Sequence, residues 1–138
     1  MSTIPVILFA CIHNSGRSVA AKVLTEYHGA GRVAVYSAGS EPGSSINVVV
    51  AQVLAERGLS TATETPKLLD AAAVQGADVV ITMGCGETCP IFPGKRYQDW
   101  LVEDPQGQDL DTVRQIVDDI DSRVQTLLAE LIGAPAIN

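Results

Sequence analysis

Short β-favouring runs alternate with amphipathic helical stretches along the whole of this 138-residue chain. Two of the runs, Val6–Ala10 and Ala77–Met83, are almost wholly apolar, which is typical of strands buried on both faces of a sheet. The expected strands lie at 6–10, 32–37, 77–83 and 97–101, and the expected helices at 19–27, 46–54, 68–74 and 113–131. This alternation predicts an α/β fold, a parallel sheet with helices on both faces and right-handed crossovers.

Length and composition narrow the class of protein further. The chain suffices for one domain, which we expect to span 1–138 with a frayed tail at 132–138. An apolar fraction of 46% favours a compact soluble fold. The net charge of −7 disfavours nucleic acid and anionic membranes as partners. The chain has no apolar run of membrane-spanning length, and its first residues lack a signal-peptide pattern, which predicts a cytoplasmic protein.

The most informative segment reads Cys-Ile-His-Asn-Ser-Gly-Arg-Ser, from Cys11 to Ser18, between the first expected strand and helix. Backbone N–H groups of such a loop converge with the helix N-terminus on one point and form an anion site. The same field favours a thiolate over a thiol, so Cys11 is a candidate nucleophile. Arg17 adds a planar donor fork that can hold two oxygens of phosphate or arsenate.

The simpler alternative is a buried structural cysteine at a strand end, with Arg17 as a surface charge. Free cysteines are often buried, so this alternative would apply to an isolated cysteine. The glycine, asparagine and two serines of the segment favour the reactive site instead. Gly16 allows the backbone to turn close to a ligand, and the serine hydroxyls can donate to an oxyanion or a thiolate.

A second cysteine pair, Cys85 and Cys89, lies in a glycine-flanked segment. In one helical turn, α-carbons at this spacing are roughly 6 Å apart, within reach of a disulfide. A reducing compartment argues against a structural disulfide framework, and neither histidine has zinc-ligand spacing to these thiols, so we expect no metal. The pair is interpreted as redox-active, with Cys85 attacking an intermediate on Cys11 and Cys89 attacking the new disulfide. The alternative is two small packing residues.

Asp104 precedes Pro105 in the connection before the last helix. A carboxylic acid here could protonate a leaving oxygen while Cys11 attacks. An Asp-Pro pair is also a common turn former, and local sequence does not separate these two interpretations. Cys11, Cys85 and Asp104 each follow an expected strand, so we expect the three groups at one edge of the sheet.

Taken together, these motifs resemble the low-molecular-weight tyrosine phosphatase superfamily, and within it the thiol-dependent arsenate reductases. The resemblance rests on the Cys-x5-Arg-Ser loop, Ser37-Ala38-Gly39, the Cys89–Pro93 segment and Asp104-Pro105, in this order along nearly the whole chain. It implies a three-layer sandwich around a four-stranded parallel sheet. It also implies reduction of arsenate to arsenite, with phosphate or sulfate as mimics of the substrate and no metal or organic cofactor.

The resemblance also implies the role of each site residue. Cys11 would be the nucleophile, Arg17 the oxyanion clamp and Asp104 the general acid. Cys85 would release arsenite by forming a disulfide with Cys11, and Cys89 would then give the Cys85–Cys89 disulfide, which a thioredoxin-like partner restores. The oxyanion would be bound by the loop formed by Ile12, His13, Asn14, Ser15, Gly16, Arg17 and Ser18, with no catalytic role for the His13 side chain.

Three alternatives stay open from the sequence. A phosphotyrosine phosphatase would use Cys11, Arg17 and Asp104 without the other two cysteines, although Gln106-Gly107 stand where that branch has aromatic residues. A second kind of arsenate reductase would recycle through a small thiol. An oxyanion-sensing module would bind arsenate without reducing it. We expect a monomer in each case.

Overall fold

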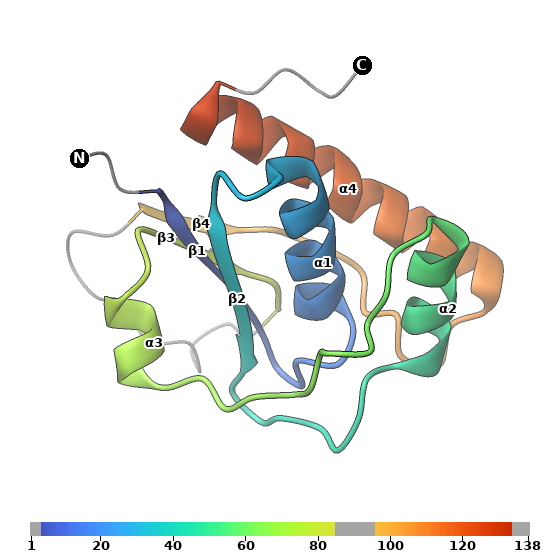
Figure 1. Ribbon diagram of the computed structural model, residues 1–138. Coiled ribbons are helices and arrows are strands. Elements are labelled where there is room, and N and C mark those ends of the chain that lie inside the picture. The colour runs from blue at the N-terminus through green and yellow to red at the C-terminus, as the bar shows by residue number, and fades with distance from the viewer. Residues whose placement is uncertain (1–3, 85–95, 134–138) are drawn as a thin grey trace.

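The computed structural model describes residues 4–84 and 96–133 (Figure 1). The strands are β1 (Val6–Cys11), β2 (Ala34–Gly39), β3 (Val79–Thr82) and β4 (Arg96–Asp99). The helices are α1 (Arg17–Gly29), α2 (Val48–Glu56), α3 (Ala71–Gln75) and α4 (Leu110–Ile132). Strands and helices therefore alternate as the sequence pattern predicts.

The four strands form one sheet in the order β2-β1-β3-β4, and every paired strand is parallel to its neighbour. β1 lies between β2 and β3, and its last residue, Cys11, is opposite Gly39 at the end of β2. Parallel strands bring their carboxyl ends to one edge, so the segments that follow β1, β2, β3 and β4 all start there. This edge carries the candidate site.

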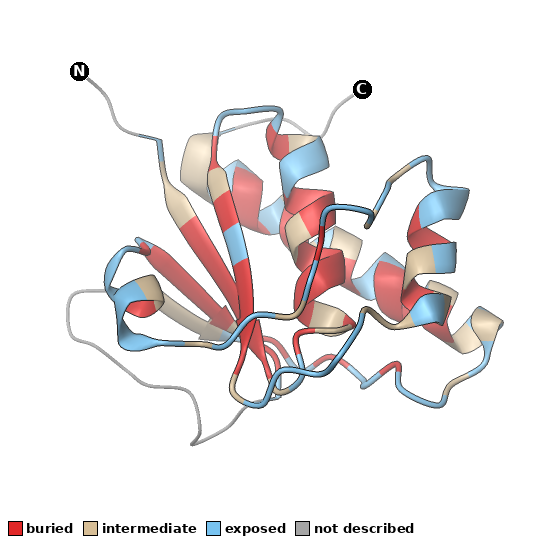
Figure 2. Ribbon diagram, turned by 60° about the horizontal axis from the view of Figure 1, so that its bottom comes forward, coloured by how far each residue is buried: buried red, intermediate tan, exposed pale blue. Residues whose placement is uncertain are grey.

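Helices cover both faces of the sheet, as predicted, but unequally. α1, α2 and α4 lie on one face and the short α3 on the other (Figure 1). Side chains of β1 alternate accordingly: Ile7 and Phe9 join the large core beneath α1 and α4, whereas Leu8 packs with Val74 of α3. Buried residues fill the centre of the sheet and the inner sides of α1 and α4 in Figure 2. The expected three-layer α/β sandwich is confirmed.

α4 shows how sequence sets the bounds of an element. The side chain of Asp109 accepts a hydrogen bond from the Thr112 N–H at 2.8 Å and caps the first turn. Gly133 ends the helix in a left-handed conformation at φ 61°, where glycine carries no steric penalty. Between these residues, one apolar stripe is buried against the sheet and α1: Val113, Ile116, Val117, Ile120, Val124, Leu127 and Leu128.

The helix expected at 68–74 is shorter than predicted. Helical structure starts only at Ala71, because the Asp70 side chain caps it through the Ala73 N–H at 2.8 Å. Leu68 and Leu69 instead extend beside the end of β2, where Gly39 donates to the Lys67 carbonyl and accepts from the Leu69 N–H. Apolar periodicity alone does not reveal this strand-like pairing, since it depends on a backbone distant in sequence.

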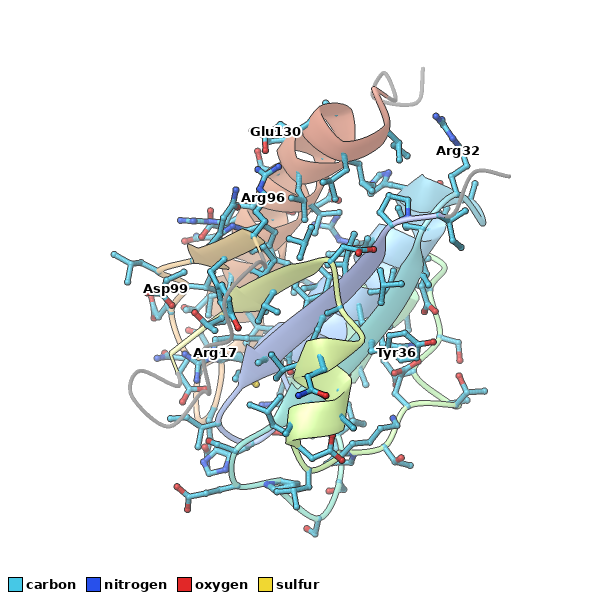
Figure 3. The ribbon with its side chains drawn as sticks, turned by 90° about the vertical axis from the view of Figure 1, so that its left-hand side faces the viewer. Arg17, Arg32, Tyr36, Arg96, Asp99 and Glu130 are labelled. Atoms are coloured by element: carbon cyan, nitrogen blue, oxygen red, sulfur yellow. The ribbon has the colours of Figure 1, made fainter. Side chains whose placement is uncertain are left out.

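Two of the ion pairs link α1 and β4 to other parts of the fold. Lys22 of α1 lies 2.9 Å from Glu64, whose residue is buried in the connection before α3. Burial opposes the charge of Lys22, but hydrogen bonds to Glu64 and Glu26 outweigh it and raise the pKa of Lys22. Arg96 of β4 pairs with Glu130 of α4 (Figure 3).

Candidate active site

The loop between β1 and α1 is held from outside by the connection between β2 and α2. Four backbone N–H groups of that connection donate to loop carbonyls over 2.8–3.1 Å. The pairs, donor first, are Ser40 to Cys11, Glu41 to Ile12, Gly43 to His13 and Asn47 to Ser15. The carbonyls of the loop therefore point outward.

This arrangement fixes where the loop N–H groups point. In a trans peptide the carbonyl and the following N–H lie on opposite sides, and the described residues contain no cis bond. The N–H groups that face the centre of the loop are therefore those of Ile12, His13, Asn14 and Gly16. The first N–H groups of α1 add to them, because no side chain caps that helix at Gly16. The loop is thus a ring of backbone donors suited to an oxyanion.

The thiol of Cys11 lies within this ring and is buried, with 2% exposure. Its sulfur accepts a hydrogen bond from the Asn14 N–H at 3.2 Å and lies 2.9 Å from the Ser18 hydroxyl oxygen. Asn14 adopts a left-handed backbone at φ 50°, a conformation that asparagine tolerates better than most residues. In the contact between Cys11 and Ser18, either atom could be the donor.

The amide of Asn14 decides the direction of that bond. The Lys67 backbone N–H donates to Asn14 Oδ1 at 2.8 Å, so the other end of the amide, Nδ2, faces Ser18. Nδ2 donates to the Ser18 oxygen at 2.8 Å. The hydroxyl proton of Ser18 is then free to point at the Cys11 sulfur. Asn14 and Ser18 are both fully buried, which protects this chain of hydrogen bonds from water.

Replacing Ser18 by alanine should therefore lower the reactivity of Cys11. A hydrogen bond to a charged group stabilises it by about 1.5–3 kcal/mol, so alkylation of Cys11 below pH 7 should slow by roughly ten- to a hundredfold. The measurement is the rate of carboxymethylation of Cys11 against pH. Thr25→Val is the matched control, because it removes another buried hydroxyl of α1 that bonds only the Ala21 carbonyl. Equal rates in Ser18→Ala and Thr25→Val would contradict the assigned direction of the bond.

Arg17, the first residue of α1, lies at the carboxyl-end edge of the sheet (Figure 3). Its side chain is 10% exposed. Nη1 donates to the Val102 carbonyl at 3.4 Å, and Nη2 lies 3.8 Å from an Asp104 carboxylate oxygen. Gly84 also packs against this group, since a methyl group at position 84 would lie 2.5 Å from Nη1. The guanidinium is thus fixed beside the ring of backbone donors.

Asp104 has contacts that fit both interpretations of its sequence. One carboxylate oxygen accepts the Gln106 N–H at 3.0 Å, as in a turn, and the other faces Arg17. The side chain is 52% exposed. Cys11, Arg17 and Asp104 line one recess, so the structure brings these three expected site residues together.

The remaining expected site residues differ in where they lie. His13, Ser15 and Gly16 also line the recess, and His13 is exposed, with its ring Nδ1 3.0 Å from the Glu41 carbonyl oxygen. Ile12 contributes backbone groups to the loop. Cys85 and Cys89 lie outside the described residues, so their expected place at this edge stays a prediction.

Three contacts of the site were not anticipated from the sequence. Val102 provides a carbonyl to Arg17, and Gly84 packs on the guanidinium. Asn47 lines the recess and caps α2 through the N–H groups of Val49 and Val50. Only Asn47 had a detectable signal, an asparagine directly before an apolar helical run.

Within 4–84 and 96–133, no group of three or more His, Cys, Asp or Glu side chains is placed to hold a metal ion. In the same ranges, no helix is both long and apolar enough to cross a bilayer.

Comparison with known proteins places this fold and loop in a family. The family model for low molecular weight phosphotyrosine protein phosphatase matches residues 6–134, and the chain belongs to this family. The glutaredoxin arsenate reductase of Synechocystis sp. is 31% identical over 128 residues, which cover 91% of this chain and 97% of that protein.

Two solved structures are also similar. The thioredoxin-dependent arsenate reductase of Corynebacterium glutamicum is 40% identical with a TM-score of 0.84; the match covers 94% of this chain but 63% of that chain. The arsenate reductase of Archaeoglobus fulgidus is 34% identical with a TM-score of 0.77, and the match covers 89% of this chain and 98% of that chain. This chain thus spans less than two thirds of the Corynebacterium protein and nearly all of the Archaeoglobus protein.

Proposed function

We propose that this protein is a cytoplasmic arsenate reductase that uses Cys11 as its nucleophile and a thioredoxin-like protein as its reductant. The observation that carries the proposal is the buried Cys11 sulfur, which receives the Asn14 N–H and the Ser18 hydroxyl inside a ring of backbone donors. Relatives described as arsenate reductases match nearly the whole chain. The choice of arsenate rather than a phosphate ester rests on these relatives and on the extra cysteine pair.

In the first step, the Cys11 thiolate attacks arsenic and an oxygen leaves as water. Arg17 and the inward N–H groups bind the remaining oxygens and stabilise the charge that develops on them. Asp104 donates the proton to the departing oxygen. The product of this step is an arsenic(V) adduct on the Cys11 sulfur.

In the second step, the Cys85 thiolate attacks the Cys11 sulfur and forms a Cys11–Cys85 disulfide. The electron pair of the sulfur–arsenic bond stays on arsenic, which leaves as arsenite. Cys89 then attacks Cys85 and frees Cys11, so the oxidised protein holds a Cys85–Cys89 disulfide. A dithiol partner reduces this disulfide. Gly84, which precedes Cys85 in the chain, packs on Arg17, and this contact supports the placement of the relay next to the oxyanion.

The second candidate function is phosphotyrosine phosphatase activity, which the family assignment and the Cys11, Arg17 and Asp104 cluster favour. Both reactions begin with the same attack of sulfur on a tetrahedral oxyanion. They differ in whether Cys85 and Cys89 are required.

Substituting Cys89→Ser separates the two functions. The variant should release about one arsenite per chain and then stop, because the Cys11–Cys85 disulfide cannot be resolved. Hydrolysis of an aryl phosphate should continue. The measurement is arsenite formed over time with thioredoxin, thioredoxin reductase and NADPH. Thr88→Ser, in the same segment, should turn over like the unmodified protein.

Continued turnover of Cys89→Ser in this coupled system would contradict the three-cysteine relay. Turnover that depends on a small thiol and glutaredoxin, with thioredoxin inactive, would favour the small-thiol enzyme. Arsenate binding without any arsenite would favour the sensing module.

A further inference from the structure

Gly16 lies against the connection that carries Asp104. A methyl group at position 16 would lie 2.8 Å from Pro105 Cγ and 3.7 Å from Val50 Cγ2. Carbon atoms in favourable contact are about 3.5–4.0 Å apart, so no side chain fits at position 16 while Pro105 keeps its place. Glycine is required here by the close approach of Pro105.

Pro105 is the apolar anchor of its connection. It is buried, whereas Glu103, Asp104, Gln106 and Gly107 around it are all exposed. The Pro105 side chain therefore holds residues 103–107 against the loop between β1 and α1.

Arg17 supplies the other attachments of this connection. Its guanidinium contacts the Val102 carbonyl and the Asp104 carboxylate. Two consecutive residues, Gly16 and Arg17, thus hold the segment from Val102 to Pro105. The ion pair between Arg17 and Asp104 holds the carboxylate only weakly, because the two groups are 3.8 Å apart and Asp104 is exposed. The contact of Pro105 with Gly16 therefore constrains the position of this segment more strongly.

We propose that Gly16 is a positioning residue, whose missing side chain lets Pro105 sit on the nucleophile loop and so sets the place of the Asp104 carboxyl. This inference rests on the proposed function, in which Asp104 is the proton donor. The Pro105 ring is bonded to its own backbone nitrogen, so Cγ can retreat only by a change of ring pucker or together with the backbone. Restoring a contact of about 3.5 Å requires a shift of about 0.7 Å, and the part of this shift that ring pucker does not supply moves the backbone next to Asp104.

The loop that holds Cys11 should not follow this shift. Its carbonyls are tied to residues 40–47 and its thiol to Ser18 and Asn14, and none of these bonds involves Pro105. A side chain at position 16 should therefore disturb proton donation and leave the nucleophile intact.

The test is Gly16→Ala, with Gly76→Ala as matched control. Gly76 lies outside the recess, at the end of α3, and its added methyl group would meet no atom closer than 3.5 Å. Gly16→Ala should lower kcat for arsenate by about ten- to a hundredfold with little change in KM, since misplacement by about 1 Å can cost this much. It should also flatten the dependence of kcat on pH that a required proton donor produces. Alkylation of Cys11 and its protection by phosphate should match the unmodified protein, and thermal unfolding should show a folded chain.

A double substitution isolates the contact with Pro105. In a Pro105→Ala background, which removes the ring atom that meets position 16, Gly16→Ala should change kcat by less than about threefold. The same loss in both backgrounds, an unchanged kcat and pH profile in Gly16→Ala, or slowed alkylation of Cys11 would each overturn the inference.

Failure of the proposed function gives a different result. If the unmodified protein and Gly76→Ala form no arsenite, arsenate reduction is refuted. The same comparison of Gly16→Ala and Gly76→Ala, made with an aryl phosphate, then still tests the role of Gly16.

Discussion

Cys11→Ser should abolish arsenate reduction, with turnover falling on the order of 10⁴-fold or more. The substitution nearly keeps the size of the side chain but replaces sulfur, which is strongly nucleophilic as a thiolate, by a hydroxyl, which is a weak nucleophile. The two hydrogen bonds that stabilise a thiolate, from Asn14 and Ser18, cannot make a serine hydroxyl an equivalent nucleophile. The measurement is arsenite formed in the thioredoxin-coupled assay.

The oxyanion site should survive this substitution. Backbone N–H groups and Arg17 bind the anion, so phosphate should still raise the melting temperature of Cys11→Ser. Arsenite formation within about tenfold of the unmodified rate would show that another group is the nucleophile. Loss of both turnover and phosphate binding would show that the variant loop is distorted.

Arg17→Lys should lower kcat/KM for arsenate by about 10²–10³-fold. Lysine keeps the positive charge but lacks the planar fork that binds two oxygens together, and one lost donor to a developing oxyanion costs about this much. A single lysine amine also cannot replace the two nitrogens of Arg17, of which one contacts the Val102 carbonyl and the other faces Asp104. Steady-state kinetics with arsenate measure the effect.

Arg123→Lys is the matched control for Arg17→Lys. Arg123 also donates to a main-chain carbonyl, that of Leu101, and pairs with a carboxylate, Asp119, but lies outside the recess of Cys11. Its substitution should leave kcat/KM unchanged within about twofold. Equal losses in the two variants would assign the effect to general destabilisation.

The sequence predicted the architecture because the main elements have strong local signals. β1 is a continuous apolar run, and α4 has a cap, one apolar stripe and a terminal glycine. The exception was the segment before α3, where Leu68 has the spacing of a helix but pairs with Gly39. Pairing of this kind depends on a partner 29 residues earlier, which no local pattern encodes.

The sequence predicted the kind of site, an oxyanion-binding loop with a cysteine, but not the contacts that orient its residues. The spacing of Cys11 and Arg17 around a glycine-containing loop indicated an oxyanion site, and the structure places both in one recess with Asp104. Local sequence could not show that Asn14 orients Ser18, because the orientation depends on the backbone of Lys67 in a distant segment. It also could not show that Pro105 sits on Gly16, since the two residues are far apart in the sequence and meet only in the folded chain.

A single turnover without reductant tests the central claim most directly. Fully reduced protein, with its three cysteines as thiols, is mixed with arsenate, and arsenite and free thiols are counted while the disulfide is mapped by mass spectrometry. Two-electron reduction of arsenic predicts one arsenite per chain, the loss of two thiols and a Cys85–Cys89 disulfide. All three thiols intact and no arsenite, in a protein that still hydrolyses an aryl phosphate, would contradict the account.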